Sequence, residues 1–366
     1  MGPLKGTRII EVAGIGPGPF AGMMLADMGA EVIVVDRPGK PGPTEFKHDI
    51  NRRGKRSIQL DLKSAEGREI FFKLCKTADA LFEGFRPGVM EKLGIGPDDV
   101  AAHNPALVYG RMTGWGQTGP LAETAGHDIN YISLSGALHA IGPKGEPPAV
   151  PLNLIGDYGG GGMMLAYGLV CGILESKSSG NGQTIDVSMV EGSSAMMSIF
   201  HTLMKNFRWA PERGINLLDG GAHFYGTFET ADGKFISFGA IEPQFMQVFI
   251  DKTGLDASWM QNHMQPAEWP RLRNELTALF KTKTSADWCG LLEGSDACFA
   301  PILPFWEAHT HPHNIARESF VEIDGTLQPA PTPKFSRTAP EVQHGPAERG
   351  ADTGAILKEL GIAGDP

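Results

Sequence analysis

Apolar and polar positions along the first 190 residues alternate in a pattern that predicts strands and helices in turn. Helices are predicted at 20–28 and 65–75. Short apolar runs of strand length occupy residues 8–13, 31–36, 57–61, 80–83, 107–112 and 184–189. Strand, glycine-rich loop, helix and strand in succession form a βαβ unit, whose strands are parallel. The pattern therefore predicts an α/β fold with a parallel sheet.

A different pattern follows residue 221. Residues 224–240 form two alternating runs around Ala231-Asp232-Gly233, which is a hairpin signal. Amphipathic helices are predicted over 244–292, and the looser stretch 206–221 suits a linker. A chain of 366 residues also favours two domains over a single core. We therefore expect a smaller second domain of mixed strands and helices.

Charge and cysteine usage exclude several classes of function. A net charge of −10 disfavours a nucleic-acid partner, although a few local Arg and Lys side chains can still bind a small anion. The four cysteines show no CxxC spacing, which indicates a reducing compartment without a disulfide or zinc framework. The first residues show no signal-peptide pattern, and the longest apolar helix is too short to cross a bilayer. A cytoplasmic protein that binds no membrane is expected.

The glycine loop after the first strand is close to a dinucleotide-binding motif. Gly16, Gly18 and Ala21 have the motif's spacing, and Asp36 ends the next strand as the ribose-binding acid would. However, Pro17 and Pro19 remove two backbone N–H donors from the loop that would hold phosphate. A tight βα turn is therefore favoured over binding of NAD.

Basic residues gather at the ends of the early predicted elements. Arg37 and Arg86 each follow a strand almost immediately, and the carboxyl ends of parallel strands form the ligand crevice of such sheets. They could converge on one anion, or form a solvated basic face. The other basic residues of this group are Arg52, Arg53, Lys55, Arg56, Lys63 and Lys92.

A histidine lies where a glycine-rich loop gives way to a predicted helix. His127 can act as a general base, because the pKa of an imidazole lies near neutrality. The alternative is a helix cap in which Asp128 accepts backbone N–H bonds. Both can hold together, since a helix N-terminus also favours developing negative charge.

A second acid/base candidate is Asp157, which stands in an apolar run before four glycines, residues 159–162. A charged group there is costly unless it is paired or functional. Four glycines also weaken a helix, by about 1 kcal/mol each relative to alanine. They are expected where a ligand or another backbone must come very close. The alternative is that Asp157 only caps a helix.

Three imidazoles recur in five residues at His309, His311 and His313. The spacing resembles a metal site, but no carboxylate or cysteine completes a familiar ligand set. No metal site is expected there.

Several long motifs, taken together, resemble the family III CoA-transferases and racemases. They occupy residues 14–19, 60–63, 83–94, 111–120, 126–136, 153–162 and 239–245. The resemblance runs from Leu4 to about Arg317 and implies an interlocked homodimer. Each subunit would have a Rossmann-like large domain built from both chain ends (1–190 and 325–366), a linker (191–221) and a small α+β domain (222–324).

The resemblance also implies a CoA site over the large domain. Lys92 stands where relatives often have arginine, so a weaker phosphate contact is expected because lysine lacks the planar fork. The implied CoA contacts are Arg37, Leu60, Asp61, Leu62, Lys63, Gly84, Phe85, Arg86 and Lys92.

By the same resemblance the catalytic residues are His127 and Asp157, with Glu242 of the partner subunit near His127. Transferases of this fold use the aspartate as an acyl-carrying nucleophile and generally lack the histidine. The pair implies a racemase that interconverts (2R)- and (2S)-2-methylacyl-CoA by two-base proton transfer through an enolate, without metal or cofactor; a transferase using Asp157 is the alternative. The implied acyl and enolate contacts are Gly126, Asp128, Ile129, Asn130 and Tyr131, with a backbone N–H near Asp128 as donor to the enolate oxygen.

Overall fold

The computed structural model describes residues 2–39, 42, 46 and 48–362, which divide into two compact units. The first unit comprises the chain up to Ser135, Leu152–Met196 and the chain from Ala316 onward. The second comprises Gly136–Pro151 and Met197–Ile315. The predicted large domain also included residue 1 and residues 363–366, which lie outside the described residues.

The first unit is built on a six-stranded parallel sheet in the order β3-β2-β1-β4-β5-β6, so the α/β prediction is confirmed. The strands are β1 (Arg8–Val12), β2 (Glu31–Asp36), β3 (Lys55–Gln59), β4 (Ala80–Glu83), β5 (Val108–Thr113) and β6 (Thr184–Ser188). The helices are α1 (Pro17–Asp27), α2 (Ala65–Cys75), α3 (Val89–Lys92), α4 (Pro97–Ala101), α5 (Asp128–Leu134), α6 (Met164–Ser179), α7 (Met189–Met196) and α14 (Thr353–Glu359), with a 3-10 turn η1 (Ile50–Arg52) and a π-helix η3 (Leu154–Met163).

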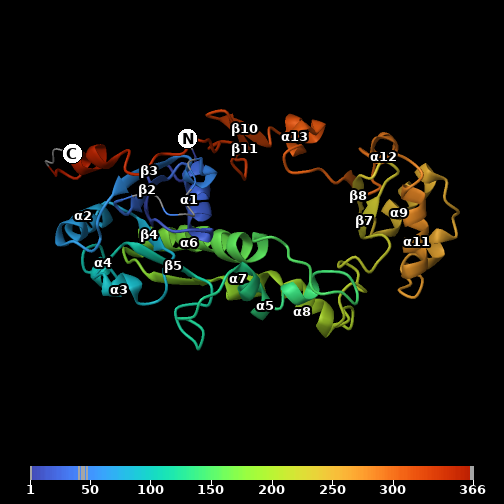
Figure 1. Ribbon diagram of the computed structural model, residues 1–366, viewed down its shortest axis with the longest axis horizontal. Coiled ribbons are helices and arrows are strands. Elements are labelled where there is room, and N and C mark those ends of the chain that lie inside the picture. Colours follow the sequence, from blue (N-terminus) through green and yellow to red (C-terminus); the bar gives the residue numbers. More distant parts are fainter. Residues whose placement is uncertain (1, 40–41, 43–45, 47, 363–366) are drawn as a thin grey trace. The chain divides into compact units, whose positions relative to one another are not determined.

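Both faces of this sheet are buried, because successive side chains of each strand point to opposite sides. Ile9 and Val32 belong to a core that α1 and α6 complete. Ile10 and Ile33 belong to a second core that includes side chains of α2 and Ile356 of α14. The helices lie on both sides of the sheet (Figure 1). Continuous apolar strands therefore form the middle layer of a three-layer unit.

The order of the strands creates a crevice. β1 pairs with β2 on one side and with β4 on the other, so the chain winds outward from β1 in two directions. The loops that leave the carboxyl ends of β1 and β4 therefore diverge, and ligands of open α/β sheets bind at such a point. The loop after β1 contains Gly16, and the loop after β4 contains Arg86.

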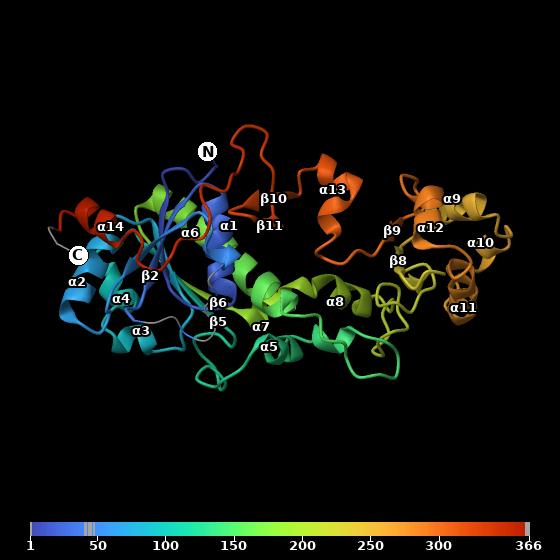
Figure 2. The same ribbon diagram turned by 45° about the horizontal axis from the view of Figure 1, so that its top comes forward.

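The C-terminal part of the chain returns to the first unit at β3 (Figure 2). The amide of Asp352 donates to the carbonyl of Ser57, and Glu359 pairs with Arg56 at 2.8 Å. Upstream of α14, the hairpin of β10 (Phe320–Ile323) and β11 (Thr326–Pro329) is tied to the same unit, because buried Arg53 donates to Gln328 and to the Pro329 carbonyl. The hairpin's first strand thus groups with the first unit, whereas the sequence assigned residues up to 324 to the small domain.

The stretch assigned to a linker, residues 191–221, contains helical structure. Its start lies in α7, which packs on the π-helix, and α8 (Ser198–Lys205) follows in the second unit. Close glycine contacts between α7 and η3, described below, hold this segment in the first unit. Two apolar side chains of α8, Ile199 and Met204, are exposed.

The second unit joins a small antiparallel sheet to a group of helices. The predicted hairpin around Asp232 is confirmed. The strands are β7 (Gly226–Glu229), β8 (Phe235–Phe238) and β9 (Phe299–Pro301), in that order; the helical elements are η2 (Leu138–Ala140), α8, α9 (Pro243–Thr253), α10 (Trp259–Asn262), α11 (Trp269–Phe280), α12 (Ser285–Leu292) and η4 (Ala308–Thr310), with α13 (Pro312–Ala316) at the chain boundary between the units. No helix in the described part of the chain is long and apolar enough to cross a membrane.

The core of the second unit encloses two histidines. His223 is fully buried, and its ring lies 5.5 Å from that of His263 and 5.9 Å from that of Trp259. Neither ring nitrogen of His223 has a hydrogen-bond partner among the described residues. Burial, together with the positive charges of His263 and Arg273, lowers the pKa of His223 to about 3. The folded unit therefore holds this imidazole neutral.

Acid should destabilise the second unit through His223. The unfolded chain takes up a proton below pH 6.5 whereas the folded unit does not, so stability is present above that pH and lost as the pH falls. Between pH 7 and pH 5 the loss is about 2 kcal/mol. Urea unfolding followed by tryptophan fluorescence at both pH values measures it. His223→Leu should flatten this pH dependence, whereas His201→Gln, at an exposed position, should not; equal slopes in all three proteins would contradict the assignment.

Candidate active site

The carboxyl edge of the parallel sheet carries most of the predicted CoA contacts. Arg37 follows β2, residues 60–63 follow β3, and residues 84–86 follow β4. Because these strands belong to one parallel sheet, in the order β3-β2-β1-β4, the three segments leave at the same edge. The side chains of Arg37, Asp61, Lys63, Arg86 and Lys92 are exposed, Leu62 and Phe85 are half-buried, and Leu60 is buried. Four exposed cationic side chains therefore lie along this edge. The buried side chain of Leu60 holds its segment to the core.

The segment from Gly84 to Lys92 is held at both ends by one arginine. Glu83 accepts from the Phe85 amide at 2.7 Å, and Arg111 of β5 bonds Glu83 at 3.2 Å. The same guanidinium bonds Glu91, the neighbour of Lys92, at 2.7 Å. Burial raises the pKa of Glu83 to about 7, against the opposing effects of the Phe85 amide and Arg111. This network fixes the loop that carries Arg86.

The remaining basic residues of the group form internal ion pairs. Arg53 pairs with Asp27 at 2.5 Å, and Lys55 pairs with Glu11 at 2.5 Å, with all four side chains nearly inaccessible. Arg56 reaches Glu31 and Glu359. These residues therefore belong neither to an anion site nor to a solvated basic face, the two interpretations that the sequence offered.

Asp36 is also occupied. Its carboxylate is buried, pairs with Arg52 at 2.7 Å and accepts from the Ser57 hydroxyl at 2.6 Å. Such a carboxylate is not available to a ribose. The tight-turn interpretation of the Gly16 loop therefore agrees with the structure better than a dinucleotide site does.

His127 is the N-cap residue of α5, where its backbone is extended and its side chain exposed. The Asn130 side-chain oxygen accepts from the His127 amide at 3.0 Å. Asn130 thus supplies the side chain that stabilises the helix start, and Asp128 does not cap α5 as the alternative interpretation had it. The imidazole is left free of a capping role.

Asp157 lies in the π-helix, an element often found at functional sites. Its side chain accepts from Asn153 at 3.0 Å, and its amide donates to Asp128 at 2.7 Å. Burial raises the pKa of the Asp157 carboxyl; the Asn153 bond lowers it, Asp128 raises it and His127 lowers it. His127 directly precedes Asp128, whose carboxylate accepts from the Asp157 amide, so the fold brings the segments of the two predicted catalytic residues together.

The four glycines of the π-helix allow close approach of backbone. A Cβ on Gly160 would lie 2.6 Å from the Ser193 amide nitrogen of α7. A Cβ on Gly162 would lie 2.9 Å from the Pro17 carbonyl of α1 and 2.7 Å from the Phe20 ring. The glycines are thus required because neighbouring helices pack directly on this element. The structure supports the explanation by contact with another backbone for Gly160 and Gly162.

Two further residues belong to the site and were missed by sequence reasoning. Gly16, at φ +71°, places its loop so that an added Cβ would lie 3.5 Å from an Asp157 carboxylate oxygen. The sequence placed Gly16 in a possible dinucleotide motif, and that motif gave no sign that Gly16 would lie beside Asp157. Asn153, which bonds Asp157, lies in the motif at residues 153–162, but that motif did not indicate which side chain would hold the carboxylate.

Tyr131 is a buried residue of α5 that packs among the predicted site residues. Its ring is 8% exposed and meets Trp115 edge to face at 4.8 Å. A Cβ on Gly126 would lie 2.7 Å from this ring, which accounts for that glycine. Burial raises the pKa of Tyr131, Asp157 raises it further and Arg86 lowers it. The pKa of this phenol therefore responds both to Arg86, a predicted CoA contact, and to Asp157, a predicted catalytic carboxyl. Ile129 and Asn130 are exposed beside it.

Glu242 is the N-cap residue of α9 in the second unit. It is therefore not part of the first unit, which carries His127 and Asp157. The three histidines after residue 308 also lie in the second unit, where His311 bonds Glu293 at 2.7 Å. No group of three or more His, Cys, Asp or Glu among the described residues could hold a metal ion.

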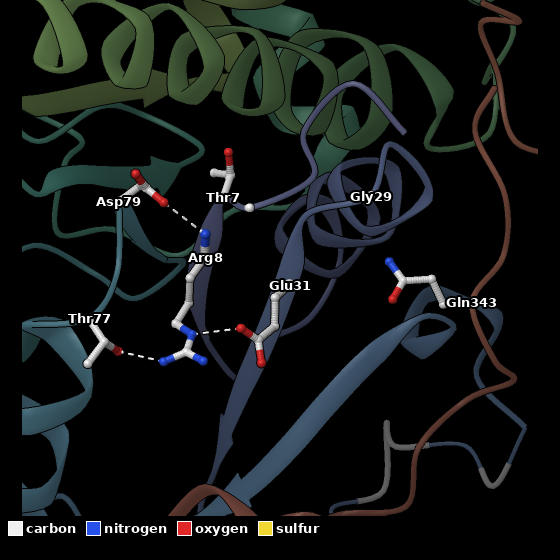
Figure 3. A pocket seen from close by; sticks show the side chains of 8 residues that line it. Thr7, Arg8, Gly29, Glu31, Thr77, Asp79 and Gln343 are labelled. Atoms are coloured by element: carbon white, nitrogen blue, oxygen red, sulfur yellow. Dashed lines mark hydrogen bonds and ion pairs between the residues drawn. The ribbon is translucent and has the colours of Figure 1, made fainter. Parts of the chain in front are cut away.

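A polar cavity of about 340 Å³ lies at the opposite, amino edge of the sheet (Figure 3). Arg8 crosses it to bond Glu31 at 2.7 Å and Thr77 at 2.9 Å, and its amide donates to Asp79 at 2.8 Å. The charged groups of this cavity already bond one another. It lacks the exposed cations and acid/base pair found at the carboxyl edge.

The family is shown by comparison with known proteins. The model of CoA-transferase family III matches residues 4–353, and the chain belongs to that family. It is 45% identical to alpha-methylacyl-CoA racemase of Mus musculus and 44% identical to that of Homo sapiens, in each case over 98% of this chain and 94% of the relative. It is 30% identical to succinyl-CoA:glutarate CoA-transferase of Mus musculus, over 98% and 87%.

The fold agrees with solved structures of this group. A CaiB/BaiF family protein from Brucella suis superimposes with a TM-score of 0.83 at 24% identity, covering 98% of this chain and 99% of that one. At this identity the likeness shows the fold alone.

The backbone contacts of the π-helix predict a large effect of one methyl group. Gly160→Ala should lower the free energy of unfolding of the first unit by about 1–3 kcal/mol, because α7 has to move away. Chemical unfolding measures it. Gly290→Ala is the control: Gly290 is an exposed position of α12 with no atom within 4 Å of an added Cβ, and the substitution should raise stability by up to about 1 kcal/mol. If Gly160→Ala kept full stability, the glycine would instead serve a ligand.

Proposed function

We propose that the protein is a racemase that interconverts (2R)- and (2S)-2-methylacyl-CoA thioesters. The observation that carries the proposal is the hydrogen bond at 2.7 Å from the Asp157 amide to Asp128, the neighbour of His127, beside the Gly16 loop at a sheet edge with exposed cations. The named racemases at 44–45% identity support the same reaction. The names of these relatives and the residues of this chain thus both support a racemase.

The reaction needs two proton carriers. The α-proton of the thioester leaves to one base, giving an enolate, and a proton from the second group adds to the opposite face. One proton is removed and one delivered, so no other reactant is consumed. Positioned acid/base groups contribute about 10²–10⁴ in rate, and stabilisation of the enolate oxygen must supply much of the rest. We assign the proton transfers to His127 and Asp157, and the donor to the enolate oxygen to the backbone near Asp128.

The raised pKa of Asp157 suits a group that works in both protonation states. A carboxyl with an ordinary pKa would be ionised at neutral pH and could accept a proton but seldom donate one. Burial of Asp157 increases its protonated fraction. The surroundings of Asp157 are therefore compatible with its accepting a proton in one direction of the racemisation and donating one in the other.

Binding of the CoA part is assigned to the carboxyl edge. Arg37, Lys63, Arg86 and Lys92 are exposed cations on three loops, and CoA carries phosphate groups. The Arg111 network keeps two of these cations, Arg86 and Lys92, in a fixed loop. We infer that neither metal nor cofactor takes part, with CoA entering as part of the substrate.

His127→Ala should abolish α-proton exchange nearly completely, and Asp157→Asn should impair it severely, because each variant removes one of the two carriers. Exchange of 2-methylacyl-CoA with deuterated solvent, followed by mass spectrometry, measures this. CoA binding, followed by calorimetry, should stay within about twofold of wild type because the sheet-edge cations are untouched. Exchange at the wild-type rate in His127→Ala would refute the two-base assignment.

A CoA-transferase is the second candidate, since the family includes such enzymes. In that reaction the Asp157 carboxylate would attack the thioester carbonyl, the C–S bond would break with CoA leaving as the thiolate, and Asp157 would carry the acyl group as a mixed anhydride. Hydroxylamine trapping distinguishes the two: modification of Asp157 during turnover would favour a transferase. Exchange with deuterium and no adduct would favour the racemase.

We also propose that the chain forms a homodimer, which would bring Glu242 of the partner subunit near His127. The exposed face of α6 supports a self-interface: Met163 just before it, then Tyr167, Val170 and Leu174, form one apolar stripe at helical spacing. The opposite face of α6 packs on the sheet. Exposed apolar stripes of this kind mark association surfaces, and the second copy implied by the family resemblance is the occupant.

Charge placed in this stripe should separate the subunits. Tyr167→Glu with Leu174→Glu should shift the sedimenting species from twice 39.2 kDa toward 39.2 kDa, because paired apolar surfaces exclude unpaired charge. Glu175→Gln on the same helix is the control and should leave the mass unchanged. A wild-type protein that sediments as a monomer at micromolar concentration would contradict the proposal.

A further inference from the structure

Asp128 occupies an unusual position for a charged residue. It is the first residue of α5 and only 7% exposed. One carboxylate oxygen, Oδ1, accepts from the Asp157 amide at 2.7 Å. The other, Oδ2, is enclosed and has no hydrogen-bond partner among the described residues. Burying a carboxylate is costly, so a specific role is required to account for it.

The contact between Asp128 and Asp157 is built into both segments. A Cβ on Gly156 would overlap the Asp128 carboxylate, so only glycine permits the carboxylate to reach the next amide. A glycine-rich π-helix has little intrinsic stability of its own. The hydrogen bond from the Asp157 amide to the Asp128 carboxylate holds the π-helix in place at Asp157, the residue whose position matters most for the proposed reaction.

We propose that Asp128 is the positioning residue that fixes Asp157 with respect to His127, an inference that rests on the proposed racemase function. Asp128 is covalently next to His127 and hydrogen-bonded to Asp157, so one residue sets the geometry of both proton carriers. Neither resemblance nor motif assigns this role to its carboxylate. A misplacement of about 1 Å between reacting groups can cost about 10²-fold in rate.

The charge of Asp128 has a second consequence that an experiment can detect. The groups that act on the Asp157 carboxyl are Asn153 from its own element and Asp128 and His127 from α5, while α1 presents the uncharged Gly16 loop. Of the two charged groups, Asp128 raises the Asp157 pKa and His127 lowers it. Removing the Asp128 charge should therefore lower the Asp157 pKa, shifting the corresponding limb of the pH–rate profile to lower pH.

Two substitutions at one position separate geometry from charge. Asp128→Ala removes the acceptor, and kcat for α-proton exchange should fall about 10²-fold with KM little changed. Asp128→Asn keeps an acceptor oxygen for the Asp157 amide, and kcat should stay within about tenfold of wild type. Only the isosteric variant should show a nearly intact rate with its Asp157 limb moved to lower pH.

Gly156→Ala breaks the same contact from the other side and should reproduce the loss seen in Asp128→Ala. Glu123→Gln, at an exposed carboxylate five residues away, is the matched control and should behave as wild type. Circular dichroism and thermal unfolding of each variant establish that it is folded; Asp128→Asn carries the test if Asp128→Ala does not fold.

The outcomes distinguish this inference from the proposed function. Wild-type kcat in Asp128→Ala, or a rise in KM alone, would overturn the positioning role while leaving the racemase intact. An unshifted pH limb in Asp128→Asn would overturn the electrostatic part. Unchanged exchange in His127→Ala would overturn the proposed function itself, and the inference with it.

Discussion

The close packing of the glycine-rich π-helix against α1 and α7 is the constraint on which the site depends. Side chains at Gly160 or Gly162 would collide with backbone atoms of Ser193 or Pro17. Because these backbones touch, Asp157 is carried to the Gly16 loop at the carboxyl end of β1. The same element receives the Asp128 carboxylate through Gly156. Small residues thus determine where the Asp157 carboxyl stands.

The basic residues of the first unit divide into two populations with different roles. Arg53 and Lys55 are buried with acidic partners and join segments distant in the chain, such as α1, β3 and the β11 hairpin. A buried ion pair of this kind contributes specificity of arrangement more readily than net stability. Arg37, Lys63, Arg86 and Lys92 remain exposed at the sheet edge. The chain can therefore have a net negative charge and still present a local cationic surface to an anionic ligand.

Racemases and CoA-transferases in one family need not differ in fold to differ in chemistry. A carboxyl group beside a bound thioester can attack the carbonyl carbon or exchange the neighbouring proton. Which of these occurs depends on the groups around it. In this chain the exposed His127 adjoins Asp128, whose carboxylate is hydrogen-bonded to the amide of the half-buried Asp157. That local arrangement, more than the sheet, is the basis of the racemase proposal.

The sequence by itself determined the parallel sheet, because apolar runs of strand length are a local property: β2, α2 and β4 begin and end where the pattern placed them. It also indicated His127 and Asp157 as candidate acid/base residues, through motifs that span only a few residues each. Tertiary structure alone decided the rest. Whether Arg53 faces a ligand or Asp27, whether Asp36 is free, and which carboxylate holds the Asp157 amide all depend on residues far apart in the chain. Such pairings arise when separate segments pack, and no local pattern of residue types records them.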